Sequence, residues 1–429
     1  MKKNCFSIGI CFFALCAITL SASAQESSWH EQRTLRLDFY HAGDAASECY
    51  WFDELVEEPY WAGSENSLVD STDFGGQQFR IVDPESGTIL YKRGYNTLFN
   101  EWQTVDEART MKKAMPESVR FPWPKEKVLL QIFARDKKNR WSKRYEQLID
   151  PASPYIRRFS PRYETFEVFY NGEPAHKIDV VLIPEGYSAE EKEAFKKACD
   201  NFVKSLFSYT PYRENRSKFN VRAVWAPSEE SGVTLPGEGI WRRTVTGASF
   251  YTFGVERYQM IEDQQRLAEI AAHVPYEYVY VLSNTQKYGG GGIYNFYGIS
   301  SANHPSSTGA VYVHEFGHLF AGLGDEYVGG VAYNDLYPQG VEPWEANLTT
   351  LTDFKSKEWS RMLDPKTPVP TPLDPAQADL LGVYEGGGYV SKGVYRPLPN
   401  GVMYPLHTTH RFCPVCEQTI RRQIEFLCR

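Results

Sequence analysis

HEFGH, at residues 314–318, is the stretch of this sequence that decides the fold. It matches the pattern H-E-x-x-H, which is typical of a helix that holds a catalytic zinc ion. Residues four apart lie on one face of an α-helix, so His314 and His318 can bind the same ion. Glu315 lies at the edge of that face, where its carboxylate can serve a water molecule on the metal. The stretch therefore predicts a zinc-binding helix with an acid–base residue beside the metal.

The residues after this helix predict the third ligand. Gly322 marks the helix end, because glycine adopts positive φ without strain and lets the chain turn sharply. A catalytic zinc takes three protein ligands and leaves one position open. Two carboxylates follow the turn, Asp325 and Glu326, and spacing alone does not separate them. We prefer Asp325 as the third ligand and keep Glu326 as the alternative.

Three motifs together carry a resemblance to a known family. HEFGHLFAGLGDEY at 314–327 is followed by NGVMYP at 400–405 and by FCPVC at 412–416. This arrangement resembles the bacterial IgA-metallopeptidase family over roughly residues 160–429. The resemblance implies a secreted zinc endopeptidase with a zincin or metzincin-like catalytic domain and an extra β-rich domain in front. It does not carry immunoglobulin specificity over, because no residue in these motifs encodes it.

The resemblance also implies roles for individual residues. His314, His318 and Asp325 would bind the zinc ion, and Glu315 would be the catalytic carboxylate. Zinc acidifies its water and polarises the scissile carbonyl, while the glutamate moves the proton to the leaving amine. The glycine and the acid each come one residue later than in the metzincin pattern, so the turn cannot simply be copied.

Supporting residues are expected near the metal. Met403 lies in a tight apolar turn, which we interpret as a soft floor under the histidines; an ordinary core methionine is the alternative. Tyr404 could stabilise an oxyanion through its hydroxyl, and Tyr327 could do the same. A buried tyrosine in a turn is the simpler interpretation of both.

A second cluster follows the methionine turn. His407, His410, Cys413 and Cys416 form H-x-x-H-x-x-C-x-x-C, which offers a structural zinc site. We favour a Cys413–Cys416 disulfide at a helix start, or a pair of reduced structural thiols. A redox-catalytic role would need a thioredoxin-like βαβ frame, which the surrounding sequence does not have.

The chain begins with features of a secretory signal. Residues 1–24 combine Lys2-Lys3, an apolar stretch and the cleavage site Ala22-Ser23-Ala24. The mature protein is expected to start at Gln25 and to work in the periplasm, on the cell surface or in the medium of a bacterium. No apolar run reaches the length of a membrane span. The net charge of −8 argues against a nucleic-acid partner.

The remaining sequence predicts two domains and an α+β fold. Residues 25–155 alternate in strand fashion between turn markers, which favours a β-sandwich. Such a domain could dock a glycan or a protein, or serve only as a scaffold. Residues 160–429 alternate strands with helices, which indicates an α/β catalytic domain. Prolines at 151, 154 and 161 mark the connecting segment.

One predicted strand bears on substrate binding. The run of glycines at 289–292 is interpreted as a flexible entry to a strand at 293–299. Zincin folds place an exposed edge strand shortly before the zinc helix, and such an edge can pair with an extended peptide. The residues assigned to this edge are Ile293, Tyr294, Asn295, Phe296 and Tyr297. An ordinary sheet strand is the alternative.

Zinc endopeptidase activity on polypeptides is the preferred function. One alternative is a secreted zinc hydrolase of a non-peptide amide, such as a cell-wall bond. Another is a non-catalytic binding protein on a zincin frame, which would be preferred if a ligand or Glu315 were missing.

Overall fold

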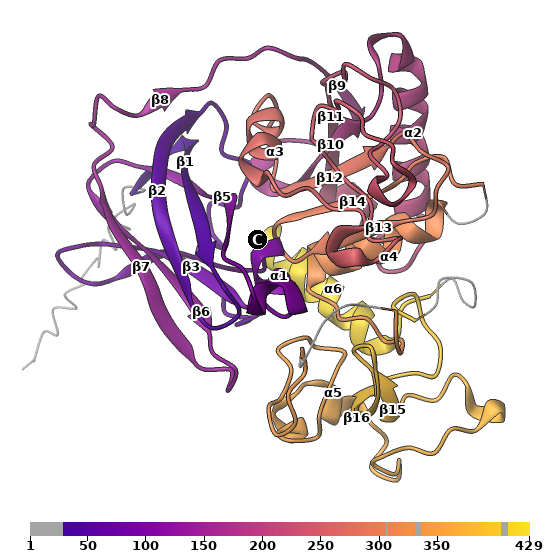
Figure 1. Cartoon of the computed structure of the whole chain (residues 1–429). Coiled ribbons are helices and arrows are strands. Elements are labelled where there is room, and N and C mark those ends of the chain that lie inside the picture. The colour runs from indigo at the N-terminus through magenta and orange to yellow at the C-terminus, as the bar shows by residue number, and fades with distance from the viewer. Residues whose placement is uncertain (1–28, 306–307, 331–335, 405–410) are drawn as a thin grey trace, which may run out of the picture.

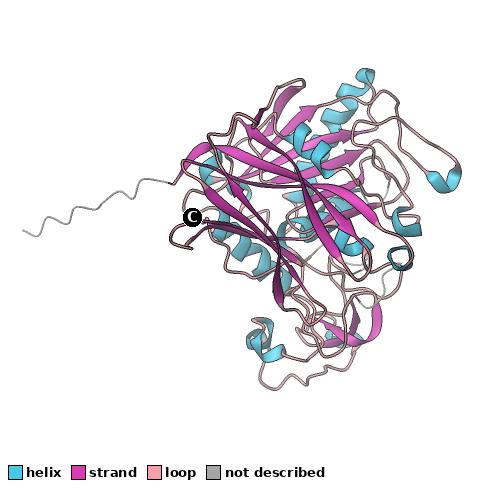
Figure 2. Cartoon of the chain, turned by 60° about the vertical axis from the view of Figure 1, so that its left-hand side comes forward, coloured by secondary structure: helices cyan, strands magenta, loops and turns pink. Residues whose placement is uncertain are grey.

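The computed structural model describes residues 29–305, 308–330, 336–404 and 411–429. The predicted signal peptide, together with His407 and His410, lies outside the described residues. The described chain is a mixed α+β structure (Figure 1) in which strands outnumber helices (Figure 2). Within these ranges no helix is both long and apolar enough to cross a lipid bilayer.

Residues 29–158, the sandwich half, form two four-stranded sheets. Their strand orders are β5-β1-β2-β8 and β4-β3-β6-β7, and all neighbours are antiparallel except the short β8 beside β2. The sheets face each other across one apolar core that includes Leu37, Ile81, Phe121 and Leu130. The strands are β1 (His30–Gly43), β2 (Glu48–Glu58), β3 (Gln77–Val82), β4 (Ile89–Tyr95), β5 (Lys113–Pro124), β6 (Val128–Arg135), β7 (Trp141–Ile149) and β8 (Arg157–Arg158).

Residues 164–429, the α/β half, are organised by a six-stranded sheet of order β13-β14-β12-β10-β11-β9. The four inner strands are parallel, and the edge strands β9 and β13 are antiparallel to their neighbours. Helices α2, α4 and α6 cover one face, and α3 covers the other (Figure 1). The strands are β9 (Glu164–Phe169), β10 (Ile178–Glu185), β11 (Phe219–Trp225), β12 (Tyr278–Ser283), β13 (Gly290–Ile293) and β14 (Tyr297–Ser301). The helices are α2 (Lys192–Leu206), α3 (Gln264–Ala271), α4 (Thr308–Ala321) and α6 (Pro414–Leu427), and a lower segment adds α5 (Trp359–Met362), β15 (Tyr384–Gly387) and β16 (Val390–Arg396).

Strand β10 shows why the middle of an inner strand can be a continuous apolar run, here Val180 to Ile183. Val180 and Leu182 belong to the core under α2 and α4, whereas Val181 and Ile183 belong to the core under α3. Helices on both faces leave no solvated side, so alternation with polar residues is absent.

The two halves share buried apolar contacts. Helix α1 (Leu98–Trp102) belongs to the sandwich half, yet its Leu98, Phe99 and Trp102 lie in the same core as α3 and β14. Asn96 N donates to Tyr294 O at 2.9 Å across the same boundary. The sandwich half is therefore packed onto the α/β half rather than attached by a linker alone.

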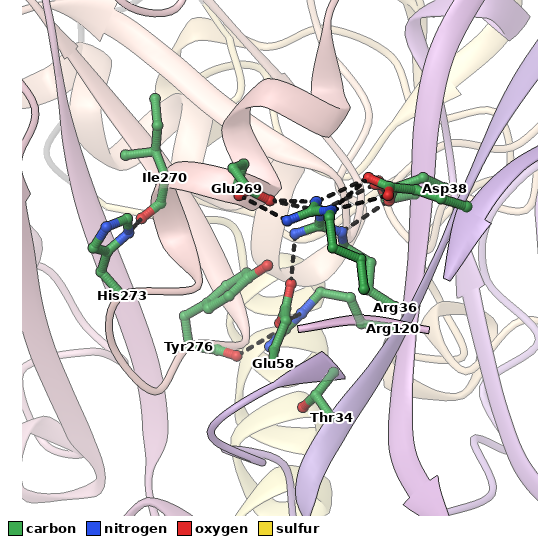
Figure 3. Close-up of polar contacts among 12 residues, drawn as sticks. Thr34, Arg36, Asp38, Glu58, Arg120, Glu269, Ile270, His273 and Tyr276 are labelled. Atoms are coloured by element: carbon green, nitrogen blue, oxygen red, sulfur yellow. Dashed lines mark hydrogen bonds and ion pairs between the residues drawn. The ribbon is translucent and has the colours of Figure 1, made fainter. Parts of the chain in front are cut away.

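A buried charge network also joins the halves (Figure 3). Strand β1 faces the sandwich core with one side and α3 with the other. On the α3 side, the Arg36 guanidinium donates to Asp38 and Glu58, each at 2.8 Å, and to Glu269 of α3 at 2.9 Å. Arg120 donates to Glu58 at 2.8 Å and to Tyr276 O at 3.0 Å. Because burial of a lone charge is costly, these partners must stay together.

Candidate metal centre

Helix α4 carries the predicted motif in a helical conformation and packs against β13 and β14. Phe316, Leu319 and Phe320 lie in the apolar core on one side of this helix. That packing leaves His314, Glu315 and His318 on the side that faces an open cavity of about 420 Å³. The helix is therefore anchored by its apolar face and presents its polar face to the cavity.

Three donor atoms converge beside α4. His314 Nε2 lies 3.1 Å from His318 Nε2, and Asp325 Oδ1 lies 3.1 and 3.4 Å from these two nitrogens. Donors bound to one tetrahedral zinc at about 2.0–2.1 Å would lie about 3.3 Å apart. The observed spacing fits a single metal ion, and the donor types suit zinc.

Hydrogen bonds orient both imidazole rings. His314 Nδ1 lies 2.8 Å from Val402 O, and His318 Nδ1 lies 2.5 Å from Leu323 O. When each Nδ1–H donates to its carbonyl, both Nε2 lone pairs are left for a metal. The main chain thus sets the tautomer that metal binding requires.

Asp325 reaches the imidazoles through a turn that glycine allows. Gly322 follows α4 with a φ of +58°, in the region that favours glycine. Asp325 Oδ2 accepts a hydrogen bond from Tyr389 OH at 2.5 Å. Its Oδ1 is buried and accepts no hydrogen bond from the described residues, although the two imidazoles are close. An oxygen placed in this way is suited to a metal ligand.

The charges of the site depend on one another. Burial alone would raise the pKa of Asp325, but the neighbouring His318 and His314 hold it well below its usual range. Burial alone would lower the pKa of His318, but Asp325 raises it to about 9. Burial raises the pKa of Glu315, and the two histidines only partly offset this. The carboxylate of Asp325 therefore attracts positive charge to the point where the imidazoles meet.

Glu326, the alternative third ligand, points away from the imidazoles. Its Oε1 accepts a hydrogen bond from Asn347 Nδ2 at 2.9 Å and lies 3.4 Å from Cys416 Sγ. Burial raises its pKa to about 7. Asp325 and Glu326 are consecutive residues, and their side chains point to opposite sides of the chain. Because Asp325 points toward the imidazoles, Glu326 points away from them.

Met403, Tyr404 and Tyr327, for which supporting roles are predicted, lie near α4 or along the cavity. Met403 is buried, and its sulfur lies close under Gly317 of α4. Tyr404 and Tyr327 both line the cavity. Tyr327 OH accepts a hydrogen bond from Arg257 at 3.2 Å, and the Arg396 guanidinium stacks 4.7 Å above the Tyr404 ring.

The edge strand lies earlier in the chain than predicted. The edge is β13 (Gly290–Ile293), and Tyr294, Asn295 and Phe296 form the turn that follows it. Of the five residues predicted for the edge, Ile293 alone lies in it, and Tyr297 begins the inner strand β14, where its hydroxyl bonds Ile261. Of the glycines predicted as a flexible entry, Gly290 to Gly292 are part of the strand, and Gly289 precedes it.

Steric contact explains why β13 begins with three glycines. A Cβ on Gly292 would lie 2.3 Å from Glu315 O, and one on Gly291 would lie 2.3 Å from Met260 Sδ. Without side chains, the strand approaches α4 closely and lies along the cavity that contains the imidazoles.

Three residues of the site had no signal in the sequence. Tyr389 lies in an aperiodic glycine-rich segment, yet its hydroxyl holds Asp325. Arg257 and Tyr288 also line the cavity, and burial, together with the nearby Glu315, raises the pKa of Tyr288 to about 12. Long-range folding brings these residues together, so local patterns could not have identified them.

Comparison with known families gives two matches. A family model described as IgA Peptidase M64 matches residues 166–380 and 373–424. A model described as Peptidase M64 N-terminus matches residues 27–146. No curated protein matches the chain significantly. The first match covers more than half of the chain and includes the donor residues, and the second coincides with most of the sandwich half.

Proposed function

The chain belongs to the IgA peptidase M64 family, and from this premise we propose that it is a secreted zinc endopeptidase. Family membership makes it a peptidase with a polypeptide substrate. The observation that supports the metal is the convergence of His314 Nε2, His318 Nε2 and Asp325 Oδ1. We assign these residues as the zinc ligands of a zincin-like catalytic half.

A zinc ion held there would act as a Lewis acid that acidifies water and polarises a carbonyl group. Glu315 lies beside both imidazoles, with its carboxylate oxygen within 4.8 Å of their nitrogens. We assign it to accept the proton of the attacking water and to donate a proton to the leaving amine. Its partly buried position, which raises its pKa, suits a group that both accepts and donates.

The cavity supports a polypeptide substrate bound in an extended form. Strand β13 pairs with β14 on one side, and Gly290 to Ile293 line the cavity. The backbone of a substrate placed along this strand could add to the sheet, next to Glu315. Asn96 and Glu101, from the sandwich half, line the same cavity. We therefore propose that the sandwich half helps to shape the substrate cleft.

The test is a peptide-library digestion by the purified protein and its Glu315→Gln variant. We expect the variant to keep its zinc and to lose about 10²–10⁴-fold in cleavage rate, because only proton transfer is removed. Glu190→Gln is a matched control, since Glu190 is exposed before α2 and is not among the residues that line the cavity. Rates of the Glu315 variant equal to those of the control would show that Glu315 is not the base. Retained cleavage in a strong zinc chelator would reject the metal mechanism.

Secretion is proposed from the signal features of residues 1–24. Expression of the full chain in a bacterial host should give an extracytoplasmic protein whose N-terminal residue is Gln25. Recovery of the uncleaved chain in the cytoplasm would contradict this proposal.

A further inference from the structure

A second group of metal-binding side chains lies behind the candidate metal centre. Glu326 extends from the chain just after Asp325, and Cys413 and Cys416 lie at the start of α6. The carboxylate oxygen and the two sulfur atoms all lie within 4.8 Å of one another. All three residues are buried. We call this group the Glu326–cysteine cluster.

Helix geometry aims both thiols at the same point. Cys413 is the N-cap of α6, and its sulfur accepts a hydrogen bond from Cys416 N at 3.1 Å. The two sulfur atoms are 2.8 Å apart, and both residues are free thiols. Burial raises the pKa of both thiols, so binding of a metal ion here would release their protons.

Glu326 is held in place, but only one of its two carboxylate oxygens has a hydrogen-bond partner among the described residues. Asn347 Nδ2 donates to Glu326 Oε1 at 2.9 Å, and the same side chain bonds Gly324 N and O, each at 2.8 Å. Glu326 Oε2 is buried and has no hydrogen-bond partner among the described residues. Buried polar atoms of this kind normally have a partner, so the free oxygen beside two sulfur atoms indicates a ligand.

Arg396 does not fill that role. Arg396 lies close enough to influence the charge of Glu326. Its Nη1 donates to Glu385 O at 2.9 Å and also bonds Gly386 O, and its guanidinium stacks on Tyr404. The Nη1 hydrogen bonds are therefore directed to main-chain oxygens, and the buried Nε has no hydrogen-bond partner among the described residues.

We propose that Glu326, Cys413 and Cys416 bind a second, structural Zn²⁺. Two thiolates and one carboxylate are ligands that zinc prefers, and they supply three of the four donors of a tetrahedral site. The 3.4 Å between Cys416 Sγ and Glu326 Oε1 fits two donors of one zinc, which would lie about 3.5 Å apart. The sulfurs would rotate apart by about 1 Å to reach their spacing of about 3.8 Å.

The second ion would stabilise the segments of the chain that hold Asp325 and His314 in the candidate metal centre. Glu326 N donates to Met403 O at 2.7 Å, and Val402 N donates to Arg411 O at 3.0 Å, just before α6. Val402 O is also the carbonyl that orients His314. An ion that ties Glu326 to α6 would therefore fix the turn that presents Asp325 and the segment that holds His314.

The test is metal content, measured on the full-length chain purified without chelators. We expect about two zinc equivalents for the natural sequence and about one for the double variant Cys413→Ser/Cys416→Ser. Cys199→Ala, which removes another buried free thiol, is the matched control and should keep both. The variant His314→Ala/His318→Ala should also hold about one equivalent, retained by the Glu326–cysteine cluster. If the histidine variant lost zinc and the cysteine variant did not, the second site would be rejected and the proposed function would stand. If the cysteine variant lost zinc and the histidine variant did not, the second site would stand and the proposed catalytic zinc site would be rejected.

Two measurements on the natural sequence keep the test decisive if the cysteine variant fails to fold. Replacement of zinc by Co²⁺ should give thiolate-to-metal charge-transfer absorption, which histidine and carboxylate ligands do not produce. Mass spectrometry of the unreduced protein should show Cys413 and Cys416 without a disulfide. A spectrum without sulfur ligation, or a Cys413–Cys416 disulfide in the purified protein, would overturn the proposal.

Discussion

Asp325 and Glu326 are adjacent in the chain, yet their carboxylates lie on opposite sides of it. Asp325 joins the two imidazoles, while Glu326 joins Asn347 and the cysteines of α6. The spacing of the motif predicted that one of these acids would complete the centre, but either choice was possible. The direction of each side chain depends on the turn after Gly322 and on Tyr389, which the spacing does not reveal.

Tyr389 leads to a prediction at the scale of a single residue. Its hydroxyl holds Asp325 Oδ2, so Tyr389→Phe should leave Oδ1 less well oriented toward the imidazoles. We expect zinc affinity to fall about 10-fold, in the range found for outer hydrogen bonds to metal ligands. Competition with a chelator measures this affinity. Tyr327→Phe is the control, because Tyr327 bonds Arg257 instead, and an equal loss in both variants would contradict the assigned role.

Local sequence patterns predict helix α4 correctly but do not predict strand β13 at its observed position. The helix has a strong signature, because its two histidines and its apolar residues repeat with helical period. The glycines of β13 have no side chains that could alternate, so the sequence predicts a flexible entry there and an edge strand that begins only at residue 293. Close contact with α4 makes this segment a strand, and that contact is a tertiary property.

Gly292→Ala tests the contact between these two elements. The added carbon would lie 2.3 Å from Glu315 O and 3.1 Å from His318 Cβ, so the strand or the helix must shift. We expect a loss of about 1–3 kcal/mol in the free energy of unfolding, together with weaker zinc binding. Urea unfolding and chelator competition measure the two effects.

Gly309→Ala is the control for that substitution. Gly309 lies on α4, and an added Cβ there would contact only the Ser205 side chain, which can move. Stability should be unchanged or higher, since alanine favours the helix. If Gly292→Ala behaved like this control, the close packing of β13 on α4 would not matter to the site.

The whole molecule depends on contacts that no local pattern predicts. The α+β class is predicted from the strand-like alternation of residues 25–155 and the alternating strands and helices of residues 160–429. The joint core of α1 and α3, and the charge network around Arg36, connect residues far apart in sequence. In the sequence these residues look like ordinary polar or apolar residues, because no local pattern reveals their long-range contacts.

Glu269→Gln tests the charge network between the halves. Burial would raise the pKa of Glu269, but hydrogen bonds from Arg157 and Arg36 outweigh it and lower the pKa to about 2. A lowered pKa stabilises the fold above the ordinary value of 4.5, and this contribution is lost as the pH falls toward 2. We expect the variant to lose about 2 kcal/mol at pH 7, and the difference to shrink below pH 4.5.

Glu54→Gln is the matched control for this prediction. Glu54 pairs with the same Arg157 at 2.8 Å, but both side chains are more than one-third exposed. Exposed pairs contribute little, so its loss should be below about 1 kcal/mol at any pH. A difference between Glu269→Gln and the natural protein that stayed constant from pH 7 to pH 3 would contradict the network's role.

Deletion of residues 25–155 tests whether the sandwich half is separable. The deletion exposes the core shared with α1 and leaves Glu269 without Arg36. We expect the remaining chain to be insoluble or to unfold without cooperativity, as circular dichroism during heating would show. A soluble fragment with normal rates on short peptides would instead make the sandwich half a separate docking module.

Zinc-edge anomalous diffraction from crystals of the natural protein examines the metal centre most directly. We predict a peak about 2.0–2.2 Å from His314 Nε2, His318 Nε2 and Asp325 Oδ1, with Glu315 beside it but not bound to it. A map with no peak between the two imidazoles in zinc-saturated crystals, or with a peak that Asp325 does not contact, would contradict this assignment.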